Sequence, residues 1–404
     1  MNCLVSFSSS KVMRTKVLGL SCAAMEEDRF SQMRPFLDEE VAGAIQRLTS
    51  ENALKRAMET FLGAEQSGWV LQHAEGVKSI EDFQSSISKP LIKRILEATA
   101  AEVSFEFPQD FDPVGALFIS NHRDIVLDPA LINLALAERG APTTEIGIGS
   151  NLLGLSWVRD VVRLNRSFVV PRGGGPREQL KASADVAAYV RKVVLDDQRS
   201  VWLAQREGRA KDGNDLTSPA LIRMLLDGGG REMWESLRVH AVSLSYEWDP
   251  CDAMKVRELL IRRANNGAYE KSDGEDERSM RQGLLEWKGR IHIAFSSPIP
   301  WEEGEDRDAV RMAAAMDAHI HKGLRPFDNA QCAAEMCGFA EESPDIVSNP
   351  NLLRACEDRM ANVVREVQQD TSFSAEDIRC VWAEMMAKPW VNAQAVRQSP
   401  AISG

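Results

Sequence analysis

The stretch VGALFISNHRDIVLDPALINLALAERG, residues 114–140, decides the fold class of this chain. It begins with a short apolar run typical of a buried strand, passes through the polar segment SNHRD, and continues into a helical pattern that ends at Gly140. A strand that leads into a helix is the repeating unit of an α/β sheet. The polar segment should therefore lie at the carboxyl end of a strand, where open α/β sheets bind their ligands.

The same alternation continues downstream. Short apolar runs alternate with amphipathic segments, of which PREQLKASADVAAYVRKVVLDD (176–197) is the clearest. Strands that alternate with helices predict a sheet with helices on both faces. The further strand candidates are TEIGIGS (144–150), SFVVPR (167–172), SVWLAQRE (200–207), LRVHAVSLSYEW (237–248) and GRIHIAFSSPI (289–299).

The chain divides into four segments by its patterns. Helical patterns precede and follow the alternating region, and the one at the C-terminal end is rich in acids. We therefore expect an α/β fold in which a sheet is flanked by helices, with helical regions at both ends. The expected segments are a tail at 1–25, a helical region at 26–105, the α/β domain at 106–300 and a second helical region at 301–404.

Residues 1–25 differ in composition from the rest of the chain. They carry Lys11, Arg14 and Lys16, many serines, and no acidic residue before Glu26. This composition fits an organellar transit peptide. A disordered tail or a misassigned start codon fits it as well, so the three interpretations stay open.

Composition excludes several classes of protein. The 404 residues carry a formal net charge of −12, which argues against a nucleic-acid partner because such proteins need a basic face. The seven cysteines include no Cys-x-x-Cys pair, so the sequence predicts neither a metal site nor a redox cofactor. There is no run of 18 apolar residues, so we expect no transmembrane helix.

The triplet HRD at residues 122–124 also occurs in the catalytic loop of protein kinases. Kinases require an Asn five residues after the Asp, and here that position is Pro129. The sequence also contains no kinase-type Gly-rich loop before the triplet and no DFG after it. A kinase is therefore excluded, and the segment needs another explanation.

The segment resembles the first motif of the phospholipid/glycerol acyltransferase family, which places an Asn and a His after a strand and an Asp a few residues later. Asn121 and His122 match this motif. Asp128 follows His122 after five residues, one more than is usual in the family, and Asp124 follows after only one. We favour Asp128 as the partner acid because it is nearest to the family position and because it could act as the N-cap of the following helix; Asp124 is the alternative.

The resemblance implies a role for this pair. A histidine with an unperturbed pKa of about 6.5 can take the proton of a hydroxyl during attack on a carbonyl. A carboxylate on the other ring nitrogen fixes the tautomer and stabilises the imidazolium, as in serine hydrolases. By resemblance, His122 is the general base and Asp128 its partner, with Asn121 and Asp124 in support.

Two further motifs follow in family order. NRSFVVPRGG (165–174) ends its strand in Arg172, which by resemblance binds the phosphate of the acceptor, and a planar guanidinium suits a phosphate. In QREGR, the contiguous Glu207, Gly208 and Arg209 resemble the family signature Glu-Gly-x-Arg without its spacer, and they are assigned to the same phosphate site. A register in which Arg206 stands at the Glu position stays open.

The resemblance, which covers about a third of the chain, implies a mixed sheet and an activity. The expected enzyme moves a fatty acyl group from acyl-CoA or acyl-carrier protein to the hydroxyl of glycerol 3-phosphate or lysophosphatidate, in phospholipid biosynthesis and without a cofactor. A lipid-binding protein without turnover and an acyl-CoA thioesterase are the alternatives. The sequence does not fix the acceptor, the chain length or the donor.

Lipid substrates imply contact with a membrane. Since no spanning segment is expected, the protein should be peripheral, on the cytoplasmic side or on the stromal or matrix side of a membrane. Residues 151–163, NLLGLSWVRDVVR, crowd apolar side chains together and are a candidate for this contact. A helix that faces the core explains the same pattern.

Overall fold

The computed structural model describes residues 29–154, 156–227, 229–304 and 308–398. The proposed transit segment, residues 1–25, lies outside this part of the chain. None of the helices in the described ranges is long and apolar enough to cross a membrane.

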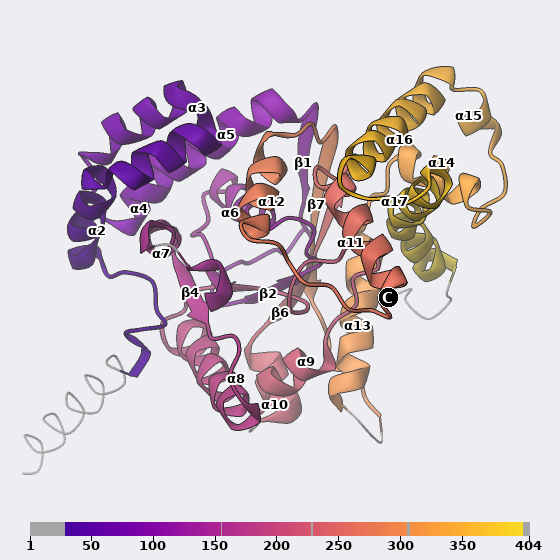
Figure 1. Ribbon diagram of the computed structural model, residues 1–404. Coiled ribbons are helices and arrows are strands. Elements are labelled where there is room, and N and C mark those ends of the chain that lie inside the picture. The colour runs from indigo at the N-terminus through magenta and orange to yellow at the C-terminus, as the bar shows by residue number, and fades with distance from the viewer. Residues whose placement is uncertain (1–28, 155, 228, 305–307, 399–404) are drawn as a thin grey trace, which may run out of the picture.

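A seven-stranded mixed sheet forms the centre of the molecule, in the order β1-β7-β6-β2-β5-β3-β4 (Figure 1). Neighbouring strands are parallel except β6 and β7, which pair antiparallel. The expectation of a mixed α/β sheet is therefore confirmed. The strands are β1 (Glu102–Glu106), β2 (Leu117–Ser120), β3 (Glu145–Gly149), β4 (Ser167–Val170), β5 (Val201–Ala204), β6 (Val239–Tyr246) and β7 (Arg290–Pro298).

Six strands lie where the sequence predicts them, but β1 was missed. Its residues EVSFE were assigned to the end of the N-terminal helical region, whose last helix in fact stops at Thr99. Ala100 is already extended, and β1 then pairs in parallel with β7. This pairing outweighs the helical preference of the local sequence, so the sheet begins at Glu102 rather than after residue 105.

Helices cover both faces of the sheet and extend the chain beyond it on two sides (Figure 1). The helices are α2 (Asp38–Ser50), α3 (Asn52–Ala74), α4 (Ile80–Phe83), α5 (Lys89–Thr99), α6 (Leu127–Glu138), α7 (Ser156–Leu164), α8 (Pro176–Arg191), α9 (Pro219–Leu226), α10 (Gly230–Ser236), α11 (Asp252–Ala264), α12 (Glu275–Leu285), α13 (Asp308–Gly323), α14 (Asp328–Met336), α15 (Pro344–Val347), α16 (Pro350–Asp370) and α17 (Ala375–Gln398).

The core has one part on each face of the sheet. On one face, α8, α9 and α13 bury aliphatic side chains against β2, β5 and β6. On the other face, α5 and α6 pack on the sheet, with Phe118 and Phe295 in edge-to-face contact. Because α13 buries Met312, Met316 and Ile320 in the first part, the expected domain boundary at residue 301 does not separate two cores.

Two helical clusters flank the sheet. The N-terminal cluster contains α2, α3, α4 and α7, and Trp157 and Val161 pack against it. This packing accounts for apolar side chains of the segment 151–163, which the sequence left open as a membrane contact. The C-terminal cluster joins α14, α16 and α17 to α11, with Trp382 fully buried at its centre.

Candidate active site

His122 and Asp128 meet at the carboxyl end of β2. β2 ends at Ser120, and a short loop leads into α6. Nδ1 of His122 lies 2.9 Å from Oδ2 of Asp128, whose side chain is fully buried. Since an ionised carboxylate only accepts hydrogen bonds, Nδ1 carries the proton and donates it to Asp128. Nε2 of His122 is then left as the acceptor nitrogen.

The loop itself holds the Asp128 carboxylate. The backbone amides of Arg123 and Asp124 both donate to Oδ2, the latter at 2.9 Å. The other oxygen, Oδ1, accepts a hydrogen bond from the Tyr246 hydroxyl at 2.7 Å. Asp128 is thus fixed by three groups besides His122.

Asp124 has a different function from the one considered for it. Its Oδ1 accepts hydrogen bonds from the amides of Val126 and Leu127 at 2.9 and 2.8 Å, so Asp124 holds the turn that leads into α6. Asp128 is the second residue of α6, and the expectation that it acts as the N-cap is therefore wrong. The five-residue spacing allows the loop to turn its amides back toward Asp128. Burial raises the pKa of Asp124.

Asn121 fastens the loop to the neighbouring strand. Its Nδ2 donates to the carbonyl of Leu244 at 2.9 Å, and its Oδ1 accepts the amide of Leu244 at 2.8 Å. Both bonds reach β6, the strand next to β2. Asn121 therefore holds the loop that carries His122 against β6, and its own side chain does not line the cavity.

The predicted phosphate-binding residues gather beside His122. A salt bridge of 3.0 Å joins Arg172, after β4, to Glu207, after β5. The amide of Ala210 donates to the carbonyl of His122 at 3.0 Å, which fixes this loop against the histidine. Gly208 has a φ of +70°, a conformation that favours glycine.

Arg209 lies deeper than Arg172. It is mostly buried and lies within electrostatic reach of the Asp124 carboxylate. Among the described residues, no group accepts a hydrogen bond from its Nη1. The structure thus places all four predicted phosphate residues around one opening, with Arg209 at its inner wall.

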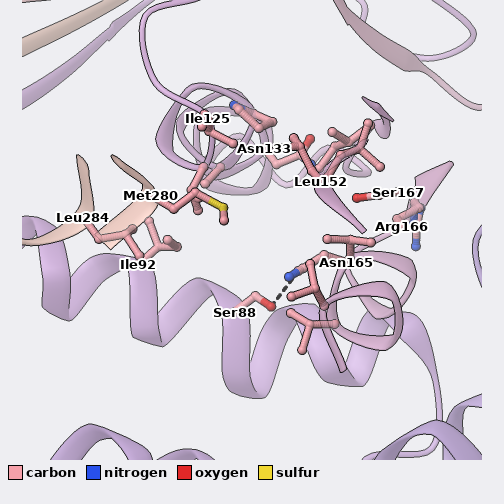
Figure 2. A pocket seen from close by; sticks show the side chains of 18 of the residues that line it. Ser88, Ile92, Ile125, Asn133, Leu152, Asn165, Arg166, Ser167, Met280 and Leu284 are labelled. Carbon is pink, nitrogen blue, oxygen red and sulfur yellow. Dashed lines mark hydrogen bonds between the residues drawn. The ribbon is translucent and has the colours of Figure 1, made fainter. Parts of the chain in front are cut away.

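A cavity of about 1190 Å³ begins at this opening. His122, Arg172, Glu207, Gly208 and Arg209 line its polar mouth. An apolar arm runs on between α6, β3 and the N-terminal helices, and Figure 2 shows Ile92, Met280 and Leu284 together on one side of it. Further apolar lining comes from Leu48, Met58, Leu134, Ile146 and Val161.

The arm is long as well as apolar. Arg172 lies at the mouth, and Arg166 and Asn165, which receives a hydrogen bond from Ser88, line the cavity at the other end of β4 (Figure 2). Arg166 directly precedes β4, and Arg172 lies two positions after its last residue. The cavity therefore extends along the length of this strand.

A buried ionic network lies under the loop that carries His122, residues 121–126, and the sequence does not predict it. Lys255 donates to the carbonyl of Arg123 at 2.9 Å and is paired with Asp249, which also binds the Arg123 guanidinium at 2.9 Å. These cations hold the pKa of Asp249 well below its usual range, against the effect of its burial. The only local signal is the run DPCDAMK at 249–255, with acids at the start of a helix and a lysine one turn later.

Within the described ranges, no three His, Cys, Asp or Glu side chains converge in a way that could hold a metal ion. The absence of a cofactor stays a prediction.

The comparisons with known proteins agree with this geometry. Residues 102–226 match the model of the Acyltransferase family. The match starts with β1, ends with α9 and includes His122, Asp128, Arg172, Glu207 and Arg209. These residues form an acyltransferase domain.

Other similarities are distant. Peptide chain release factor 1 of Burkholderia thailandensis is 26% identical over 172 residues, which cover 39% of this chain and 46% of that protein. The same factor from Burkholderia mallei is 25% identical over 172 residues. The chain thus spans about half the length of these curated relatives.

Among solved structures, the 1-acyl-sn-glycerophosphate (LPA) acyltransferase PlsC of Thermotoga maritima matches with a TM-score of 0.33 and 13% identity, over 68% of this chain and 93% of that one. The assignment of the acyltransferase domain rests on the family model and on the geometry of the site.

Proposed function

We propose that this protein transfers an acyl group from a thioester to the hydroxyl of a glycerophosphate, either glycerol 3-phosphate or lysophosphatidate, in phospholipid biosynthesis. The observation that carries the proposal is the position of the His122–Asp128 pair. It lies where a cationic opening meets a long apolar cavity. An acceptor with an anionic head and a donor with a hydrocarbon chain match these two environments.

His122 supplies the base in the proposed reaction. The acceptor oxygen attacks the thioester carbonyl carbon while its proton moves to Nε2 of His122. Asp128 holds Nδ1 and stabilises the imidazolium that forms. The tetrahedral intermediate then collapses, the C–S bond breaks, and the imidazolium returns the proton to the leaving thiolate. The products are an ester and a free thiol.

The oxyanion of the intermediate needs donors beside His122. Among the described residues, the amides of Glu207, Gly208 and Arg209 donate to no other protein group, and the three residues line the cavity mouth together with His122. Backbone amides at such a position can stabilise a developing oxyanion. We assign the oxyanion site to this loop.

The phosphate of the acceptor has cations within the opening. Arg172 is partly exposed there, and its present partner Glu207 is largely exposed, so solvent screens their salt bridge and a phosphate can compete for it. Arg209 adds positive charge at the inner wall. A guanidinium can bind a phosphate through two parallel hydrogen bonds.

The apolar arm would take the acyl chain. Its walls consist of aliphatic side chains, and burial of a hydrocarbon chain there is favourable at about 25 cal/mol per Å² of apolar surface. The donor is acyl-CoA or acyl-carrier protein, and we expect the enzyme to reach its lipid partners at a membrane surface, as a peripheral protein on the cytoplasmic, stromal or matrix side.

The test is release of thiol from purified protein supplied with acyl-CoA or acyl-carrier protein, with and without each acceptor. The proposal predicts release that depends on the acceptor and is lost in His122→Ala. Release without any acceptor would instead identify a thioesterase. A protein that binds the lipids but releases no thiol from either donor would be a lipid-binding protein without turnover.

A further inference from the structure

The two oxygens of the Asp128 carboxylate have different partners. Oδ2 receives the proton of His122 Nδ1 and the two loop amides, whereas Oδ1 receives only the hydroxyl of Tyr246, at 2.7 Å. Tyr246 is the last residue of β6, which lies next to β2 in the sheet. The strand pairing therefore carries the tyrosine to the side of Asp128 that faces away from the histidine.

The direction of this hydrogen bond is fixed by chemistry. Burial, followed by the negative charge of Asp128, raises the pKa of Tyr246 well above its usual value, so the phenol keeps its proton. An ionised carboxylate only accepts. The phenol is thus a permanent donor to a carboxylate that water does not reach.

We propose that Tyr246 is a positioning residue for acyl transfer, holding Asp128 in register with His122 and setting how strongly the His122–Asp128 pair binds a proton. This inference rests on the proposed function. The three side chains form a chain of hydrogen bonds from β6 through α6 to the mouth of the cavity.

The electrostatic effect has a definite sign. A donor on Oδ1 stabilises the negative carboxylate, so the pair gains less from binding one more proton. Without that donor, one oxygen of a buried carboxylate has no partner, and the pair binds the proton more tightly. Because the two groups share a hydrogen bond, the prediction concerns the pair and not either residue alone. The base form would then appear only at higher pH.

Other charged groups surround the His122–Asp128 pair, and they are the same in the wild type and in a variant that lacks the Tyr246 hydroxyl. A second cavity, of about 30 Å³, lies beside Tyr246. The charged and titratable side chains that line this cavity are Arg123 from the loop after β2, Asp215 after β5, Asp249 after β6 and His321 on α13. Asp124, from the same loop as Arg123, also lies close enough for its charge to act on Tyr246.

The experiment compares Tyr246→Phe with Tyr189→Phe. Tyr189 is a matched control, because its hydroxyl donates to the buried Glu145 carboxylate at 2.6 Å on the β3 side of the sheet. We expect the acid limb of the kcat/KM profile to move to higher pH in Tyr246→Phe, by roughly 0.5 to 1 pH unit, and to stay in place in Tyr189→Phe. An equal loss of activity at every pH in Tyr246→Phe would overturn the inference.

A second variant strengthens the same bond. The chain contains three tyrosines, so replacing all of them with 3-fluorotyrosine is feasible, and the more acidic phenol is a better donor. The acid limb should move to lower pH, and the same labelling in Tyr246→Phe should remove that movement. A movement that persists in Tyr246→Phe would also overturn the inference.

A readout independent of turnover separates this inference from the proposed function. The midpoint of the imidazole NMR titration of His122, assigned with His122→Ala, should rise in Tyr246→Phe alone. If the wild-type protein transfers no acyl group but the midpoint rises, the proposed function fails and the tyrosine effect stands. If transfer occurs and neither the midpoint nor the acid limb moves, the inference alone fails.

Discussion

At the scale of single residues, two carboxylates four positions apart have separate functions. Asp128 binds His122, and Asp124 holds the turn that leads into α6. The sequence predicts the His122–Asp128 pair because both residues belong to one short motif. It does not predict Tyr246 or Lys255, whose bonds to this loop span 118 and 132 positions and depend on the pairing of β2 with β6 and the packing of α11.

This division predicts different outcomes for two similar variants. Asp128→Asn should lower kcat by about 10²- to 10⁴-fold, because the imidazolium loses its counter-charge. Asp124→Asn should lower kcat by less than about tenfold, because it changes the turn before α6 and leaves the His122–Asp128 pair intact. Steady-state kinetics at one pH, with circular dichroism as a check on folding, compare the two. Equal losses would contradict the assignment.

Asp215 predicts how stability depends on pH. Burial raises the pKa of Asp215 from its usual 3.8 to about 6. The folded state then binds a proton that the unfolded state has released, so this group lowers stability as pH rises from about 4 to 6. Asp215→Asn removes the effect.

We therefore expect Asp215→Asn to be more stable than the wild type at pH 7 by up to about 3 kcal/mol, with the difference vanishing near pH 4. Urea unfolding across this pH range measures it. If the stability of Asp215→Asn minus that of the wild type were lower at pH 7 than at pH 4, the predicted direction of the effect would be wrong.

At the scale of elements, α6 links the chemistry to the cavity. It starts beside His122, and Val126, Ala130 and Ala137 line the cavity from the near end to the far end of the helix. The sequence predicts α6 from its apolar pattern, but not the cavity, because the opposite wall comes from α3 and α5, far away in the chain. β1 was missed for a similar reason, since only its pairing with β7 makes it a strand.

Two substitutions on α6 should therefore shorten, to different extents, the acyl chains that the protein accepts. Ala130 and Ala137 are separated by seven residues, or about 10 Å along the helix. Ala137→Phe should reduce transfer of long acyl chains and spare medium ones, whereas Ala130→Phe should reduce both. A series of acyl donors of increasing length measures kcat/KM. If both variants show the same length profile, the chain does not lie along α6.

In the molecule as a whole, the C-terminal helices are connected to the loop that carries His122. Arg359 on α16 binds the buried Asp252 carboxylate through two hydrogen bonds of 2.8 and 2.7 Å, and Trp382 on α17 donates to it at 3.0 Å. Asp252 begins α11, the helix that carries Lys255 to the loop. The sequence predicts helices in this region but not that they support the site.

Arg359→Gln should lower the free energy of unfolding by about 3 kcal/mol, since it leaves a buried carboxylate without its counter-charge. Arg365→Gln is the matched control, because Arg365 lies exposed on the same helix and, among the described residues, donates a hydrogen bond to the side chain of Asn362 alone. Denaturant unfolding compares them. Equal stability of the two variants would show that the C-terminal cluster does not depend on this pair.

The proposed reaction is acyl transfer to a glycerophosphate with His122 as base. Its most direct test is mass spectrometry of the ester formed from an isotope-labelled acyl thioester and glycerol 3-phosphate or lysophosphatidate, with wild-type protein and His122→Ala. We expect a labelled ester with the wild type and at least about a hundredfold less with the variant. Labelled ester formed at the same rate by both proteins, or labelled free acid as the sole product, would contradict it.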